Sequence, residues 1–127
     1  AQKSSAAGWY SPGSHEIGLA VQNLATWAHE LVHAADDRLG TLKEHGQHWQ
    51  SETVAELGGA TLLYAVGYTT DADLGGAWRY ISEYAREAQI EPLNACLSVL
   101  SRVCEAVDLI LKTAETLKTT RSQDVAA

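Results

Sequence analysis

The segment that most constrains this chain is His29-Glu-Leu-Val-His33, an H-E-x-x-H sequence. It lies within residues 19–39, which contain neither Pro nor Gly, so the segment is predicted to be helical. Histidines four residues apart project from one face of a helix, so His29 and His33 can bind the same metal ion. Glu30 lies beside them and is predicted to hold a water molecule rather than the metal.

A third ligand is needed, because two histidines hold zinc loosely and a catalytic site has three protein ligands. In the H-E-x-x-H-x-x-G-x-x-H arrangement the glycine and the third histidine would fall at Asp36 and Leu39, so that arrangement is excluded. Glu52 follows His33 by nineteen residues, and Glu56 lies one helical turn further on. This spacing resembles the gluzincin arrangement, in which a Glu from the next helix completes the site.

The roles of the two acids follow from this interpretation. Glu52 is predicted to bind the metal, and Glu56 to accept a hydrogen bond from the far ring nitrogen of His29 or His33. Two carboxylates in an otherwise buried helix cost several kcal/mol each unless they are paired or metal-bound. The reversed assignment stays open, and so does an interpretation without metal, in which both acids and the histidine face are solvated.

The pattern of apolar residues predicts a mainly α (α+β) fold in a single domain spanning residues 1–127. Helices are expected at residues 21–37, 48–66, 73–87 and 91–117. Residues 9–19 contain a Ser-Pro-Gly turn and are expected to form a small N-terminal β-hairpin or edge strand. Residues 1–8 and 118–127 are expected to be flexible.

Apolar stripes identify the expected core. The first helix should bury Leu24, Trp27, Ala28, Leu31 and Ala35, and the last should bury a stripe from Leu93 through Leu97, Leu100 and Val103 to Ala114. Other polar residues are not assigned to the site. The histidines His15, His45 and His48 are expected at the surface, the tyrosines Tyr64, Tyr68 and Tyr80 in the core, and Asp36 and Asp37 as solvated acids at the helix end.

Composition narrows the class of protein. The net charge is −7 and no Lys/Arg cluster occurs, so direct nucleic-acid binding is not expected. No apolar run is long enough to span a bilayer. Cys96 and Cys104 are eight apart in a helical pattern, about 12 Å along the axis, too far for a mutual disulfide. Buried free thiols are therefore expected, which favours a reducing, cytoplasmic location.

The two acid- and histidine-bearing segments resemble a known family. His29-Glu-Leu-Val-His33 and Glu52-Thr-Val-Ala-Glu56-Leu-Gly-Gly-Ala60 are similar to the H-E-L-x-H and E-x-V-A-E-x-G-A-A sequences of ArdC-type antirestriction proteins. Trp9-Tyr-Ser-Pro resembles the edge strand of that family. The resemblance covers most of residues 9–111 and implies a zincin-like metallopeptidase domain of the kind found on plasmids, phages and other mobile elements.

These observations lead to the expected function, a zinc-dependent peptidase with Glu30 as the general base and a peptide or protein as substrate. Zinc would lower the pKa of water toward neutral, and Glu30 would take its proton. Mn²⁺ or another divalent ion is an alternative to Zn²⁺. The alternative functions are a metal-binding regulatory domain with little turnover, and a helical domain without metal.

Overall fold

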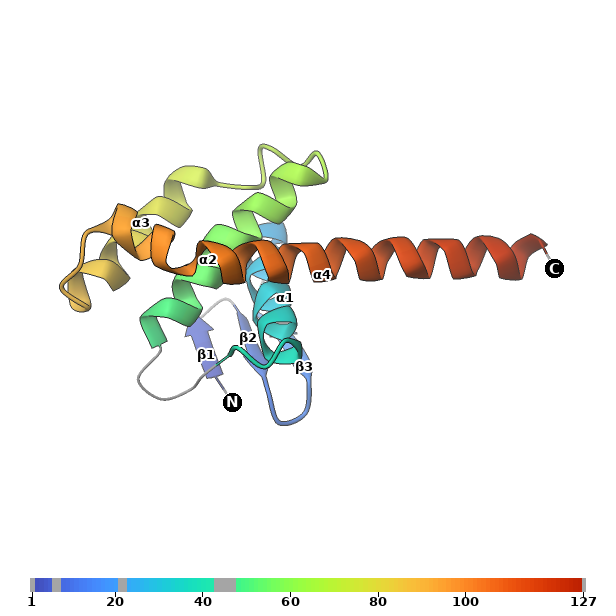
Figure 1. Ribbon diagram of the computed structural model, residues 1–127, viewed down its shortest axis with the longest axis horizontal. Helices are drawn as coiled ribbons and strands as arrows, with labels where there is room; N and C mark the ends of the chain where they lie inside the picture. The colour runs from blue at the N-terminus through green and yellow to red at the C-terminus, as the bar shows by residue number, and fades with distance from the viewer. Residues whose placement is uncertain (1, 6–7, 21–22, 43–47, 127) are drawn as a thin grey trace.

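The computed structural model describes residues 2–5, 8–20, 23–42 and 48–126. Within these residues the chain has a small antiparallel sheet at its N-terminus, followed by four helices (Figure 1). The helices are α1 (Leu24–Arg38), α2 (His48–Ala65), α3 (Leu74–Glu87) and α4 (Pro92–Ala126). The mainly helical fold class predicted from the sequence is confirmed.

The sheet consists of β1 (Gln2–Ser5), β2 (Gly8–Ser11) and β3 (Glu16–Leu19), in the order β1-β2-β3. Strands β2 and β3 form the predicted hairpin, and Trp9 lies opposite Gly18, where any larger residue would overlap the indole ring. Within the segment that is expected to be flexible, residues 2–5 form β1, whose backbone pairs with β2. Residues 1, 6 and 7 lie outside the described part of the chain.

Helix α1 begins where the sequence supplies a cap. Asn23 is the N-cap, and its side-chain oxygen accepts a hydrogen bond from the backbone N–H of Thr26. The helix ends before Gly40, whose φ of 77° is the left-handed conformation that stops helices. The predicted start at Val21 lies outside the described residues, and the end is one residue later than predicted.

The buried face of α1 differs from the predicted one. Leu24 and Trp27 were expected in the core but are 40% and 41% exposed. Ala28 and Ala35 lie in the core as predicted, together with Val32, and His29 and His33 are buried beside them. The helix is therefore rotated toward its polar stripe, because α2 packs against the histidine-bearing side.

Helix α2 is the central element and contacts α1, α3 and α4 (Figure 1). It is buried over most of its length, as its apolar composition predicted, and contributes Val54, Leu62 and Leu63 to the core. A Cβ atom on Gly58 would lie 2.9 Å from Val32 Cγ1, and one on Gly59 would lie 3.1 Å from the backbone nitrogen of His29. The two glycines therefore allow α1 and α2 to approach closely.

Helix α4 is longer than predicted. Its apolar residues Leu93, Leu97 and Leu100 are exposed, and the buried stripe is Ala95, Val99, Val103 and Ala106. The small side chains of this stripe let α4 lie close to α2. Past Ile110 the helix extends away from the other elements, and residues 111–123 are all exposed (Figure 1).

The last helix is predicted to end at Leu117 but continues to Ala126, through residues 118–126 of the expected flexible tail. No Pro or Gly follows Pro92, and good helix formers such as Leu117 and Lys118 continue the pattern. Thr119 and Thr120 hydrogen-bond to the carbonyls four residues earlier and so remain compatible with a helix.

The cysteines are free, as predicted, but Cys104 is exposed and Cys96 is half-buried, so the expectation of buried thiols was wrong for Cys104. Cys104 faces outward because the buried stripe of α4 consists of Ala95, Val99, Val103 and Ala106. Among the described residues, no helix is long and apolar enough to cross a membrane.

Candidate metal centre

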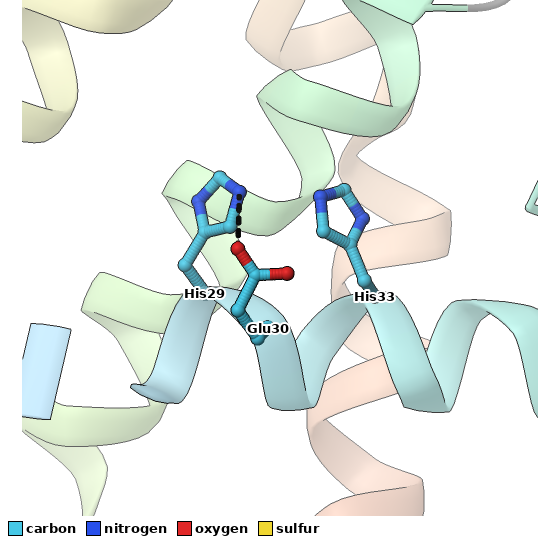
Figure 2. A group of neighbouring side chains, drawn as sticks. All are labelled: His29, Glu30 and His33. Carbon is cyan, nitrogen blue, oxygen red and sulfur yellow. Dashed lines mark ion pairs between the residues drawn. The ribbon is translucent and has the colours of Figure 1, made fainter. Parts of the chain in front are cut away.

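The two histidines of α1 lie side by side within the protein. His29 is 8% exposed and His33 1% exposed, and their ring centroids are 4.7 Å apart. The one-turn spacing on the helix accounts for this arrangement. Figure 2 shows both imidazoles on the same side of α1, with the Glu30 carboxylate directed between them.

Glu52 reaches both imidazoles from α2. Its Oε2 atom lies 3.2 Å from His29 Nε2, and its Oε1 atom lies 3.1 Å from His33 Nε2. The Glu52 side chain is fully buried. Close contact of α1 with Gly58 and Gly59 accounts for this approach, since both glycines lie within two turns of Glu52.

These distances can be compared with those of a metal site. Two donor atoms that each lie about 2.0–2.1 Å from one tetrahedral zinc ion are about 3.3–3.4 Å apart. The separations of 3.1 and 3.2 Å between Glu52 and the two imidazoles are close to this value. Glu30 is also near, since His29, Glu30 and His33 have potential ligand atoms within 4.8 Å of one another. However, the Glu30 carboxylate is 3.9 Å from His29 Nε2, so Glu52 fits the third-ligand position better.

Hydrogen bonding within the cluster is incomplete. Among the described residues, His29 Nε2, His33 Nε2 and Glu52 Oε1 are buried and have no hydrogen-bond partner. The Nε2 atoms lie within ion-pair distance of Glu52, but the directions do not suit hydrogen bonds. Buried polar atoms without hydrogen-bond partners destabilise the folded state, and a cation bound among them would remove this destabilisation. The donor set of two imidazoles and a carboxylate therefore fits a divalent ion such as zinc.

Glu56 lies on the other side of the first imidazole. Its Oε1 atom is 3.0 Å from His29 Nδ1, one helical turn from Glu52. Such a carboxylate fixes the orientation of the ring and leaves Nε2 directed at the cluster. Burial disfavours the charged form of His29, but the contacts with Glu52 and Glu56 outweigh it and raise the pKa of His29 to about 10.

The same contacts act on the carboxylate in the opposite direction. Burial favours the neutral form of Glu52, but its contacts with His29 and His33 outweigh burial and lower the pKa of Glu52 to about 2. In the metal-free protein the cluster is thus held by an imidazolium and a carboxylate, and a metal ion would take the place of the proton.

A cavity of about 370 Å³ opens beside this cluster, between α1, α2 and α3. His29, Glu30 and Glu56 line one part of it, and Tyr80 and Tyr84 of α3 line another. The Tyr84 hydroxyl donates to Glu52 Oε2 over a long distance of 3.4 Å. Burial and the nearby charges of Glu52 and Glu56 raise the pKa of Tyr84, so its phenol remains a hydrogen-bond donor.

Tyr84 was not identified from the sequence. Its spacing from Ile81 and Trp78 is that of a core-facing helix residue, and no motif distinguishes it. Trp78, on the same helix, is instead 49% exposed. The ring of His48, at the start of α2, meets the Tyr84 ring edge-on with centroids 6.1 Å apart. His48 is exposed, as the sequence assignment expected.

The two acids after His33 are not the solvated helix-end residues that were expected. Asp36 is fully buried and accepts hydrogen bonds from Arg102 of α4, with Nη2 2.5 Å from Oδ2. Asp37 accepts a hydrogen bond of 2.5 Å from the hydroxyl of buried Tyr10, which attaches the sheet to α1. Arg102 lies within the apolar stretch of the last helix, between Leu100 and Val103. Its position there is the signal in the sequence that an acidic residue such as Asp36 would be buried opposite it.

The other sequence assignments fall outside the cluster. His15 is exposed, as expected, and lies 3.5 Å from Asp37. The expectation that Tyr64 and Tyr68 lie in the core was wrong, because they are 56% and 53% exposed. His45 lies outside the described residues.

Comparison with known proteins adds no relative. No protein-family model, curated protein or solved structure matches this chain. The similarity to ArdC-type proteins stays a prediction from the motifs.

Proposed function

We propose that this chain is a zinc-dependent metallopeptidase-like domain in which His29, His33 and Glu52 hold the metal. The observation that carries the proposal is the convergence of two buried imidazoles and a buried carboxylate at separations of 3.1 and 3.2 Å. Membership of the ArdC-type family, which the motifs suggest, is part of the proposal.

The residues around the metal ligands have complementary roles. A zinc ion held there would supply Lewis acidity and lower the pKa of water toward about 7. Glu30 accepts the proton of the attacking water and passes it to the departing amine. Glu56 keeps the His29 ring in place through Nδ1. The cavity beside the cluster admits the peptide.

The first test measures metal content and peptide cleavage together. Protein purified without added metal is expected to contain about one zinc per chain and to cleave an unfolded substrate such as casein. Glu30→Gln should retain the zinc and lose at least about a hundredfold in rate. If the wild type contains zinc but cleaves no faster than Glu30→Gln, the peptidase proposal is wrong and a metal-binding regulatory domain remains.

A second test separates the two candidate ligands. Glu52→Ala is expected to weaken zinc binding more than Glu56→Ala, because Glu52 contacts both Nε2 atoms and Glu56 contacts only Nδ1 of His29. Chelator competition measures both affinities. Equal or reversed losses would overturn the ligand assignment.

A further inference from the structure

The cavity beside the metal cluster has an unusual lining. Three carboxylates reach it from three different places in the chain: Glu30 on α1, Glu56 on α2 and Asp73 at the start of α3. Among the described residues that line it, none is Lys or Arg. The summed negative charge of these three acids and Glu52 exceeds the positive charge of a divalent ion bound to the ligands. The cavity is therefore negative.

The walls leave room for a side chain. The apolar part of the lining consists of alanines and glycines from α1, α2 and α3: Ala25, Ala55, Gly59, Ala60, Ala72, Gly76 and Ala77. No large aliphatic side chain is among the described lining residues, so the cavity offers little apolar surface to a leucine or phenylalanine. Tyr84 adds an aromatic ring, which attracts cations, and Tyr80 adds a second ring, over which the Arg79 guanidinium already lies at 5.3 Å from the centroid.

We propose that this cavity binds the positively charged side chain of a lysine or arginine in the peptide substrate. The inference names a substrate class for the proposed peptidase and rests on that function for its biological role. Binding itself requires only the charge and shape of the cavity. A negative cavity with small and aromatic walls favours a long cationic side chain over an apolar or acidic one.

Asp73 provides a clean means of changing this charge. It is exposed, has a φ of 45° and caps α3, its Oδ1 accepting from Gly76 N at 3.1 Å. Asparagine both tolerates this left-handed conformation and caps helices well, so Asp73→Asn removes the charge while keeping the local structure. Asp71 is also exposed, lies two residues away and is not among the lining residues, so Asp71→Asn is a matched control.

The test compares three alanine-rich peptides that differ at one central position, which is lysine, norleucine or glutamate. Calorimetry measures their binding to the zinc-loaded and the metal-free chain. The lysine peptide is expected to bind at least about tenfold more tightly than the norleucine peptide, and added salt should reduce the difference. Asp73→Asn should reduce the lysine preference about three- to tenfold, and Asp71→Asn should leave it unchanged.

Each outcome bears on the inference separately from the peptidase proposal. Equal binding of the lysine and norleucine peptides, or no binding of either, would overturn the inference. Equal effects of the two Asp→Asn variants would do so as well, because they would indicate attraction by the overall charge of −7. A lysine preference without cleavage would support the cation site and count against the peptidase.

Discussion

At the scale of single residues, Tyr84 is the side chain that links α3 to the candidate metal ligands. Its hydroxyl donates to Glu52 Oε2 at 3.4 Å, a long contact, so its effect should lie at the low end for such supporting hydrogen bonds. Tyr84→Phe is expected to weaken zinc binding about tenfold, as chelator competition would measure. Tyr80→Phe is the control, because Tyr80 lines the same cavity without a hydrogen bond to Glu52. Equal losses in both variants would contradict this role.

The ion pair of His29 and Glu52 predicts how the metal-free protein depends on pH. Since the pKa of His29 rises from 6.5 to about 10, its contribution is complete below pH 6.5 and is lost as the pH rises through about 10. Since the pKa of Glu52 falls from 4.5 to about 2, its contribution is complete above pH 4.5 and is lost as the pH falls toward 2. The metal-free protein should therefore be most stable between pH 4.5 and 6.5.

Thermal unfolding of the metal-free protein as a function of pH tests this expectation. The loss of Tm between pH 8 and about 10 should be smaller in His29→Gln, which has no imidazolium to lose. If His29→Gln loses as much Tm over this pH range as the wild type does, groups other than His29 cause the loss.

At the scale of elements, the metal site depends on the distance between α1 and α2. Gly59→Ala places a Cβ atom 3.1 Å from His29 N and 3.3 Å from the carbonyl carbon of Ala28, both in the backbone. Neither can move freely, so the variant should lose about 1–3 kcal/mol of unfolding free energy and bind zinc more weakly. Gly75→Ala is the control, because its Cβ would meet nothing within 4 Å. Urea unfolding measures the free energy of unfolding of the two variants, and zinc titration measures their zinc affinity. Unchanged zinc affinity in Gly59→Ala would contradict this dependence on the helix distance.

At the scale of the whole molecule, Arg102 connects three helices. It pairs with buried Asp36 of α1, and its Nη2 lies 3.5 Å from Ser51 Oγ of α2. Arg102→Met leaves Asp36 charged and buried, which should cost about 3–5 kcal/mol of unfolding free energy. Lys112→Met should cost less than about 1 kcal/mol, because its pair with Asp108 is exposed. Similar urea midpoints for the two variants would contradict a structural role for Arg102.

The sequence predicted more of the site than of its surroundings. The proximity of His29 and His33 followed from helical periodicity. That of Glu52 followed from a spacing that resembles the gluzincin arrangement, with the cost of burying an acid as a second reason. A contact of Glu56 with His29 or His33 was predicted from the same spacing, and the structure shows that the partner is His29. These predictions depend only on positions within one helix or on the pairing of two consecutive helices. The role of each residue toward a metal stays a prediction.

Features that depend on how helices rotate against one another could not be read from the pattern. The exposure of Trp27 and Leu97 depends on which of two adjacent stripes packs against the core, and residues such as Val32 and Val99 pack there instead. The contact of Tyr84 with Glu52 joins positions thirty-two residues apart and needs the position of α3. The last helix continues past the predicted end at Leu117 to Ala126, because the helix propensity of residues 118–126 outweighs their polar composition.

The most direct test of the account is an anomalous-scattering map recorded at the zinc edge from crystals of the zinc-loaded protein. The account predicts one strong peak between α1 and α2, about 2.0–2.1 Å from His29 Nε2, His33 Nε2 and an oxygen of Glu52. A map without a peak there, or a zinc ion bound elsewhere while these three side chains keep their metal-free contacts, would contradict it.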